Sequence, residues 1–259
     1  MDLGLQNKVV VVTGGAKGIG QAIANALAAE DAVPVIVGRD AADNDAAVLQ
    51  IRNAGGRAYA VTAELTDPNA CRQAVAEAAQ VGQIAGLVNN AGVNDSVGLE
   101  HGSYEAFMAS LHRNLVHYYL MAQLTLPYFK ATGGAIVNIG SKTAETGQGN
   151  TSGYAAANGG RHALTREWAV ELLPYGIRVN AIVVAESFTP LYAKWINTFP
   201  DPAEKLRTIR ARIPLGHRMT TPEEIAHMAV FLLSEKSSHT TGQLIHVDGG
   251  YTHLDRAIS

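Results

Sequence analysis

The sequence predicts an α/β domain built on a doubly wound parallel sheet of about seven strands, with helices on both faces. Short apolar runs alternate with stretches of helical spacing along the chain. Such alternation is typical of a parallel sheet, because each helix carries the chain back to the start of the next strand. No linker, repeat or low-complexity segment interrupts the 259 residues. We therefore expect one domain over residues 1–259.

The first strand and helix set the pattern. Val9–Val12 is a continuous apolar run that ends in Thr13 and two glycines, as buried parallel strands often do. Ile19–Glu30 follows with apolar residues at helical spacing. Further strands are expected over Val33–Val37, Ala58–Val61, Leu87–Asn89, Ala135–Ile139, Arg178–Val184 and Leu244–Val247. Helices are expected over Ala41–Ala54, Pro68–Val81, Tyr104–Lys130 and Tyr154–Leu173.

The segment from Phe188 to Arg218 interrupts the alternation. It contains Pro190, Pro200, Pro202 and Pro214 between short amphipathic pieces. A long insertion of this kind in a compact domain is usually functional. We interpret residues 188–218 as a substrate flap within the domain.

Composition and charge argue against several classes of partner. The net charge of −3 gives no electrostatic reason to expect nucleic acid or an anionic membrane. No apolar run approaches about 18 residues, and MDLGLQNK lacks the features of a secretion signal. Cys71 is the single cysteine, which excludes an internal disulfide and fits a reducing compartment. We expect a cytoplasmic protein, and the nine histidines show no metal-binding spacing.

A glycine-rich turn joins the first strand to the first helix. It reads Thr13-Gly14-Gly15-Ala16-Lys17-Gly18-Ile19-Gly20. Gly14 allows a sharp turn, Gly18 allows the backbone to approach a pyrophosphate, and Gly20 allows the helix to pack on the sheet. The free N–H groups at the helix start then face an anionic phosphate. In an alternating chain this position favours a Rossmann-type dinucleotide site, although the glycine spacing differs from G-x-G-x-x-G.

Several motifs occur in the order and spacing of one enzyme family. They are the glycine turn, Asn89-Asn90-Ala91-Gly92, Asn114, Ser141, Tyr154 and Val247-Asp248-Gly249-Gly250. In these the chain resembles the short-chain dehydrogenase/reductase family over essentially its full length. The resemblance implies a nicotinamide-dependent oxidoreductase that acts on a CH–OH group and commonly forms a homotetramer.

A closer resemblance is to bacterial sugar dehydrogenases of the L-fucose dehydrogenase type. It is carried by Ala91–Ser96, Ser141–Ala144, Gly147–Gly153, Thr165–Trp168 and Asp248–Ala257. This resemblance implies a sugar or secondary alcohol as substrate, with an L-fucose-like sugar favoured. The tail Tyr251–Ser259, with Asp255 and Arg256, is expected to reach a neighbouring subunit.

The family resemblance also implies catalytic roles. Tyr154 would accept the hydroxyl proton in oxidation and return it in reduction, Ser141 would hold the substrate oxygen, and Asn114 would organise a water in a proton relay. In the family a lysine four residues after the tyrosine binds the nicotinamide ribose and favours the phenolate. Residues at i and i+4 share a helix face, so this spacing brings the two groups together. Here that position is Asn158, which can hydrogen-bond a ribose but carries no charge.

Three interpretations of Asn158 remain open at this stage. It could inactivate the enzyme, it could mark a chain that kept the site for binding alone, or another charge could replace the lysine. For the third, the candidates are the positive ring of the cofactor and Lys142 beside Ser141. Val184 stands where the family usually has proline, and this favours the first two. The sequence therefore predicts an enzyme scaffold with impaired turnover, and the alternative is a non-catalytic dinucleotide-binding sensor or partner subunit.

The end of the second strand bears on cofactor choice. Arg39 follows Gly38 there, and Lys17 is expected at the same corner. Two cations suit a ribose 2′-phosphate, so NADP(H) is favoured. Asp40 could instead turn towards a ribose 2′-hydroxyl, which leaves NAD(H) possible. The remaining residues expected to line the cofactor are Ile19, Glu64, Leu65, Asn90, Ala91, Gly92, Tyr154, Asn158 and Thr189, together with Gly14, Gly18 and Gly20.

The expected substrate residues lie on loops at the carboxyl edge of the sheet. A sugar needs several hydrogen-bonding groups and an apolar or aromatic face. Besides Ser141, the candidates are Asn94, Lys142, Gln148, Glu186 and Trp195.

Overall fold

The computed structural model describes residues 2–254. Its centre is a seven-stranded parallel sheet in the order β3-β2-β1-β4-β5-β6-β7. The strands are β1 (Val9–Thr13), β2 (Val33–Gly38), β3 (Tyr59–Thr62), β4 (Ile84–Asn89), β5 (Gly134–Ser141), β6 (Ile177–Val184) and β7 (Leu244–Val247). Between β1 and β4 the strand order reverses direction, and clefts for ligands form at such a point in open α/β sheets. The predicted doubly wound fold is confirmed.

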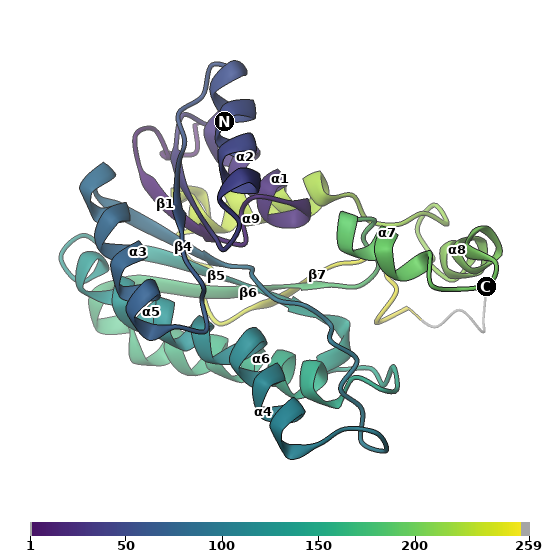
Figure 1. The fold of residues 1–259 in the computed structure, drawn as a ribbon. Helices are drawn as coiled ribbons and strands as arrows, with labels where there is room; N and C mark the ends of the chain where they lie inside the picture. The colour runs from purple at the N-terminus through teal and green to yellow at the C-terminus, as the bar shows by residue number, and fades with distance from the viewer. Residues whose placement is uncertain (1, 255–259) are drawn as a thin grey trace.

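Helices cover both faces of the sheet (Figure 1). One face carries α1 (Gly18–Ala29) and α9 (Pro222–Leu233), whose Ile23, Leu27 and Ile225 pack on the buried valines of β1. The other face carries α3 (Pro68–Val81), α5 (His117–Phe129) and α6 (Ser152–Glu171). Helix α2 (Ala41–Asn53) packs beside α1 over β2. The strands are apolar on both sides because both sides are covered.

Helix α9 was absent from the sequence prediction. It begins with a capping box, in which the Thr221 hydroxyl accepts from the Glu224 N–H and the Glu224 carboxylate accepts from the Thr221 N–H. Pro222 occupies the first turn, where its missing N–H costs nothing. The apolar residues Ile225, Ala226, Ala229, Val230 and Leu233 then bury one face. The signal was therefore present in the sequence.

The predicted long helix over Tyr104–Lys130 has three parts. It consists of α4 (Tyr104–Leu111), a π-helical turn (His112–Val116) and α5. Such turns are rare and often lie at functional sites. Asn114 sits in this one and is fully buried.

The predicted flap contains two helices, α7 (Pro190–Ile196) and α8 (Pro202–Ala211), which extend beyond the carboxyl edge of the sheet (Figure 1). An aromatic row of Phe188, Tyr192, Trp195 and Phe199 runs through the first of them, with neighbouring ring centroids 5.0–5.9 Å apart. Among residues 2–254 no helix is long and apolar enough to cross a membrane.

Candidate active site

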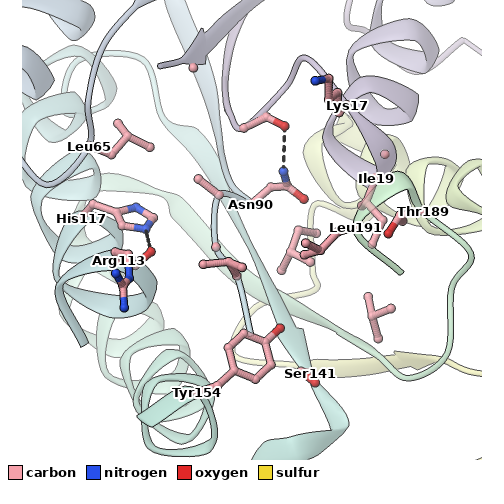
Figure 2. Close-up of a pocket in the computed structure, with 18 of the residues that line it drawn as sticks. Lys17, Ile19, Leu65, Asn90, Arg113, His117, Ser141, Tyr154, Thr189 and Leu191 are labelled. Carbon is pink, nitrogen blue, oxygen red and sulfur yellow. Dashed lines mark hydrogen bonds between the residues drawn. The ribbon is translucent and has the colours of Figure 1, made fainter. Parts of the chain in front are cut away.

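A cavity of about 560 Å³ opens along the carboxyl edge of the sheet, where the strand order reverses. Its walls come from the glycine turn, the ends of β2 to β6 and the start of α7. Figure 2 shows Lys17 and Ile19 at one end and Tyr154 and Ser141 at the other. Of the predicted cofactor residues, those on the wall are Gly14, Lys17, Gly18, Ile19, Arg39, Glu64, Leu65, Asn90, Ala91, Gly92, Tyr154 and Thr189.

The glycine turn is shaped to hold a phosphate. Gly18 has φ of +56°, which residues with a side chain rarely adopt. A Cβ on Gly20 would lie 2.2 Å from the carbonyl oxygen of Gly14, so the helix start could not pack there. The N-cap residue of α1, Lys17, makes no side-chain cap hydrogen bond to the first turn. The N–H groups at the start of α1 thus suit the pyrophosphate of a dinucleotide.

Asn90 braces the turn from the neighbouring strand. Its Nδ2 donates to the carbonyl oxygens of Thr13 at 2.9 Å and Gly14 at 3.2 Å, and its backbone N–H donates to the Thr13 hydroxyl at 2.9 Å. Its side chain is therefore engaged with the turn, and the turn is fixed in shape.

The corner beyond β2 holds the predicted cofactor-selecting charges. Asp40 caps α2, where its Oδ1 accepts from the Asp43 N–H at 3.0 Å. Lys17 forms an ion pair with Asp43. Arg39 is exposed on the cavity wall. Glu64, which also lines the cavity, accepts from the backbone N–H and the hydroxyl of Thr66, at 3.1 and 3.0 Å.

Ser141 and Tyr154 meet at the far end of the cavity (Figure 2). Ser141 is the last residue of β5, and Tyr154 lies in the first turn of α6. The Ser141 oxygen accepts from the backbone N–H of Thr143 at 3.3 Å and from its hydroxyl at 3.1 Å. Two donors on this oxygen orient the Ser141 proton away from them, which leaves it available to a substrate oxygen.

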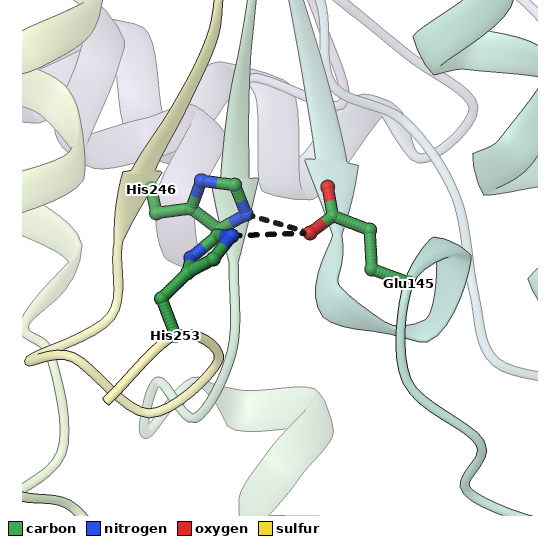
Figure 3. A group of neighbouring side chains, drawn as sticks. All are labelled: Glu145, His246 and His253. Carbon is green, nitrogen blue, oxygen red and sulfur yellow. Dashed lines mark hydrogen bonds and ion pairs between the residues drawn. The ribbon is translucent and has the colours of Figure 1, made fainter. Parts of the chain in front are cut away.

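A cluster of titratable groups follows Ser141 in the chain. Glu145, just after the 3₁₀ turn at Lys142–Ala144, meets His246 of β7 and His253 (Figure 3). The Nε2 atoms of His246 and His253 lie 3.0 and 3.9 Å from Glu145 Oε2. No sequence spacing indicates this group, because about a hundred residues separate Glu145 from His246.

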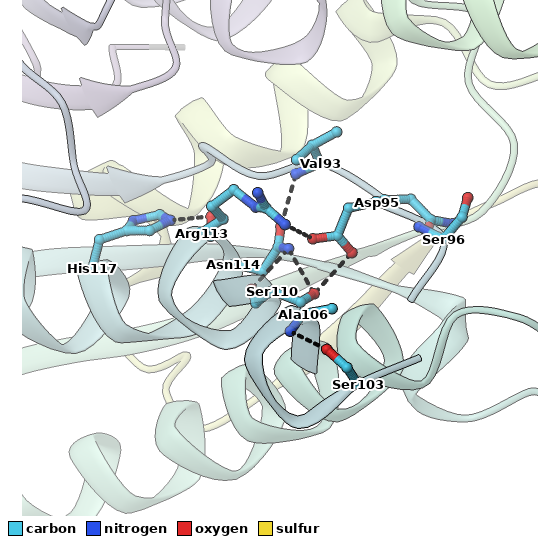
Figure 4. Close-up of polar contacts among 10 residues, drawn as sticks. Val93, Asp95, Ser96, Ser103, Ala106, Ser110, Arg113, Asn114 and His117 are labelled. Atoms are coloured by element: carbon cyan, nitrogen blue, oxygen red, sulfur yellow. Dashed lines mark hydrogen bonds and ion pairs between the residues drawn. The ribbon is translucent and has the colours of Figure 1, made fainter. Parts of the chain in front are cut away.

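Asn114 is held by a local network rather than exposed on the cavity wall. Its Oδ1 accepts from the Val93 N–H at 2.7 Å, and its Nδ2 donates to the Ser110 carbonyl at 3.0 Å (Figure 4). Ser110 donates to Asp95, which also pairs with Arg113 at 2.7 Å. The main-chain carbonyl of Asn114, in the π-helical turn, accepts a hydrogen bond from α6 at 2.7 Å.

Comparison with known proteins gives the family. The family model described as enoyl-(acyl carrier protein) reductase matches residues 14–252. L-fucose dehydrogenase from Bos taurus is 34% identical over 245 residues, which span 94% of this chain and 88% of that protein. The chain belongs to the short-chain dehydrogenase/reductase family.

Solved structures of this family share the whole fold. Cj0485 dehydrogenase is 46% identical with a TM-score of 0.93, covering 99% of this chain and 98% of that one. A putative NAD(P)-dependent gluconate 5-dehydrogenase from Beutenbergia cavernae, solved with bound NADP, is 32% identical with a TM-score of 0.90 and covers 98% of this chain and 100% of its own.

Asn158, which replaces the family's lysine, points away from solvent. It is fully buried and does not belong to the cavity wall. Its Nδ2 donates to the Tyr154 carbonyl at 2.9 Å, and its Oδ1 accepts from Arg161 at 3.0 Å. Arg161, which the sequence analysis did not consider, does lie on the wall of the cavity.

Lys142, the other cation considered from the sequence, is already engaged. It is buried, forms an ion pair with Glu186, and lies 4.1 Å from the centre of the Tyr251 ring. Glu186 also accepts from the Tyr192 hydroxyl at 2.8 Å. Burial, and next the charge of Glu186, raise the pKa of Tyr192, so Tyr192 stays a hydrogen-bond donor.

The three remaining predicted substrate residues, Asn94, Gln148 and Trp195, do not line the cavity. Asn94 accepts from the Ser96 N–H at 3.2 Å, Gln148 is exposed, and Trp195 is 40% exposed in the aromatic row. The predicted subunit contacts of Asp255 and Arg256 lie outside the described residues.

Proposed function

We propose that this protein is an NADP(H)-dependent oxidoreductase that transfers a hydride between the nicotinamide and a secondary alcohol of a sugar, with an L-fucose-like sugar favoured. One observation carries the proposal: a phosphate-binding turn and a Ser141–Tyr154 pair lie at opposite ends of one cavity. The proposal treats residues 1–259 as one dinucleotide-binding and catalytic domain, with residues 188–218 as its substrate flap. We also propose a homotetramer in the cytoplasm, as the family resemblance suggests.

The cofactor, when bound, supplies or accepts the hydride. Ser141 donates a hydrogen bond to the substrate oxygen and fixes it beside Tyr154. The Tyr154 phenolate accepts the alcohol proton in oxidation, and the resulting Tyr154 hydroxyl returns it in reduction. The catalytic proton relay includes Asn114, whose side chain is fixed by hydrogen bonds to Val93 and Ser110.

The NADP(H) preference rests on the corner beyond β2. Asp40 is engaged as the cap of α2, and this leaves it poorly placed to accept from a ribose hydroxyl. Arg39 is exposed on the cavity wall, where a guanidinium can bind a 2′-phosphate with two parallel hydrogen bonds.

The sugar preference rests on the groups beside Ser141. Lys142, Glu186 and Tyr192 form a hydrogen-bonded set, and Trp195 adds an aromatic face. Polar groups beside an aromatic face are what a sugar requires. A relative of 34% identity bears the name L-fucose dehydrogenase.

We propose that turnover in this chain is below that of lysine-bearing relatives. Asn158 provides an amide where the lysine provides a charge, and Val184 provides no fixed φ beside the nicotinamide. The extent of the loss depends on whether a different cation acts on Tyr154.

Two measurements test this function together. Nicotinamide fluorescence gives the affinity for NADPH and NADH, and a rate assay with NADP⁺ gives turnover on L-fucose, related sugars and simple secondary alcohols. We expect NADPH to bind more tightly than NADH and L-fucose-like sugars to be oxidised slowly. Tight binding without turnover on any of these compounds would favour the non-catalytic alternative, and no binding of either cofactor would overturn the proposal.

A further inference from the structure

Arg161 is a buried cation beside the proposed catalytic tyrosine. We propose that its guanidinium replaces the missing lysine: it supplies the positive charge that acts on Tyr154 and a donor for the nicotinamide ribose. This inference rests on the proposed function. It adds a residue that acts on the proton-transfer step, although Arg161 lies three positions beyond the place where the family has its lysine.

The geometry places Arg161 within the catalytic end of the cavity. Tyr154, Asn158 and Arg161 follow one another at i, i+4 and i+7, so they share one face of α6. The guanidinium carbon lies 5.9 Å from the centre of the Tyr154 ring. Arg161 is 3% exposed, so solvent screens its charge far less than it would at the surface.

The guanidinium is held by neutral acceptors. Its Nε donates to the Asn114 carbonyl at 2.7 Å, and its Nη1 donates to the Ile139 carbonyl at 3.1 Å and to Asn158 Oδ1 at 3.0 Å. No ion pair neutralises Arg161 within residues 2–254, so its positive charge remains available to Tyr154. Burying an unneutralised charge is costly, and proteins accept this cost mainly where the charge has a function.

The outer nitrogen of the guanidinium, Nη2, lies against Gly92 of the cavity wall. Nη2 is buried and has no hydrogen-bond partner within residues 2–254. The backbone of Gly92, on the cavity wall, comes so close that a Cβ there would lie 2.8 Å from Nη2. A buried donor without a partner is rare. A small shift of the guanidinium past Gly92 would let a ribose hydroxyl in the cavity become its partner.

Asn158 has a role in this arrangement. Its amide links the Tyr154 carbonyl to Arg161, and it therefore positions the cation. A lysine at 158 would instead place a second positive charge against the guanidinium. The sequence alone predicts that Asn158→Lys raises kcat, whereas the structure predicts this gain only where Arg161 is removed as well.

Other titratable groups pack around the pair. They are Tyr118 and His117 of α5, Arg113 of the π-helical turn, and His162 of α6. The Tyr118 hydroxyl donates to the Ile139 carbonyl, and burial raises its pKa. Burial, followed by the charge of Arg161, lowers the pKa of His117 to about 4. Burial also lowers the pKa of His162, which favours its neutral form.

The test compares Arg161→Met with Asn158→Lys/Arg161→Met. We expect Arg161→Met to lower kcat and to move the pH midpoint of sugar oxidation upward by about 1–3 units, as for loss of a close cation. The double variant should recover most of the lost kcat and most of the shift in the pH midpoint, because it restores the family's lysine. Arg161→Lys keeps the positive charge but loses the three hydrogen bonds that Nε and Nη1 donate. It should therefore shift the pH midpoint less than Arg161→Met.

The control is Arg178→Met. Arg178 is also partly buried and donates to carbonyls, of Leu232 and Ser234, but it lies outside the cavity wall. Its loss should lower thermal stability and leave the pH midpoint unchanged. If Arg161→Met folds and keeps the parent's pH midpoint, or if Arg161→Lys shifts the midpoint as far as Arg161→Met does, the inference is wrong.

A second readout separates this inference from the proposed function. Phenolate absorbance of the cofactor-free protein, taken as the difference from Tyr154→Phe, reports Tyr154 ionisation without any substrate. If no sugar is oxidised, the proposed function fails, but an upward shift of this titration in Arg161→Met would still support the role of Arg161. An unchanged titration would overturn it.

The cluster beside β7 carries a second, independent proposal. We infer that Glu145, His246 and His253 bind a divalent transition metal such as zinc. Their ligand atoms all lie within 4.8 Å of one another, and both Nε2 atoms point at the same carboxylate oxygen (Figure 3). Zinc bonds of ~2.0–2.2 Å keep tetrahedral ligands roughly 3.5 Å apart, so small side-chain shifts would admit the ion.

A fourth group supports the carboxylate from behind. His162 Nδ1 lies 3.6 Å from the other oxygen of Glu145, and a slight approach would form the hydrogen bond that orients a metal-bound carboxylate. Two imidazoles and one carboxylate suit zinc, cobalt or nickel better than magnesium or calcium. The cluster joins β7 and the chain after it to the turn that follows Ser141, so a bound ion would stiffen that turn.

Cobalt(II) absorbance and zinc competition on chelator-treated protein test the site. We expect one equivalent to bind, and His246→Ala to abolish binding, while His239→Ala, at an exposed histidine, leaves it intact. A parent protein that binds no cobalt or zinc, or a His246→Ala protein that binds as the parent does, would overturn the proposal.

Discussion

The two ends of the cavity differ in how closely they follow the family. The phosphate end keeps the glycine turn, and the Asn90 side chain braces it. The catalytic end keeps Ser141 and Tyr154, but it has Asn158 and Val184 where the family has lysine and proline. The two ends differ in this way because cofactor phosphate binding and proton transfer place different physical demands on the residues.

The phosphate end depends on backbone geometry, which few residues can supply. A Cβ on Gly20 would overlap the Gly14 carbonyl, so no residue other than glycine fits at position 20. The catalytic end depends on a charge near Tyr154. A charge can come from any position whose side chain reaches the same place, and Arg161 reaches it from the next turn of α6. Electrostatic roles can therefore move along a helix where steric roles cannot.

The largest expected effect comes from removing the proton-transfer group. Tyr154→Phe should lower kcat by about 10²–10⁴-fold, the range for loss of a general acid–base group. The affinity for NADPH should change little, because the phosphate end is untouched. Steady-state rates and fluorescence titration of the same preparation check both statements.

Ser141→Ala is the matched variant for that experiment. It removes the group that holds the substrate oxygen, so it should also lower kcat while leaving NADPH binding intact. If Tyr154→Phe weakened NADPH binding as strongly as it lowered turnover, cofactor binding and catalysis would not be independent functions of the two ends of the cavity.

The next effect concerns the phosphate end. Arg39→Ala should weaken NADP(H) binding by about 1.5–3 kcal/mol, as for lost charge-assisted hydrogen bonds, and should leave NAD(H) binding nearly unchanged. Calorimetric titration of both cofactors measures the difference. Arg72→Ala, at an exposed arginine on α3, should alter neither affinity. Equal losses for the two cofactors would contradict the 2′-phosphate assignment.

Most of the fold could be predicted from the sequence, because buried parallel strands are marked by continuous apolar runs. The phosphate turn could be located for a similar reason, since its glycines are adjacent in sequence and in space. Helix α9 was missed although its capping box and apolar spacing were readable at Thr221–Leu233. The π-helical turn at Asn114 left no pattern, because one extra residue in a helical turn does not disturb the apolar spacing enough to be seen.

The charge at the catalytic end could not be predicted. Sequence reasoning located the absence of lysine at 158 but not the replacement. The position of Arg161 depends on carbonyls of Asn114 and Ile139, which come from another helix and a strand, and on the space left by Gly92. The same holds for Glu145, His246 and His253, which meet only in the fold.

The smallest expected effect uses His117 as a reporter of the catalytic end. His117 lies on the cavity wall, and its Nε2 is 2.9 Å from the Arg113 carbonyl. Burial first, and the charge of Arg161 second, lower its pKa from 6.5 to about 4 in the folded protein. Below pH 6.5 the unfolded chain therefore binds a proton at this residue that the folded chain does not.

The sign of the effect follows from that difference. Stability from His117 is complete above pH 6.5 and is lost as the pH falls towards 4, by at most ~1.4 kcal/mol over the first unit. His117→Gln should remove this part of the acid sensitivity, which urea unfolding at pH 7 and at about pH 5.5 would show. In Arg161→Met the His117 pKa, followed by NMR, should rise only part of the way to 6.5, because burial is the larger cause. A complete return would mean that the guanidinium alone sets the electrostatics of this end.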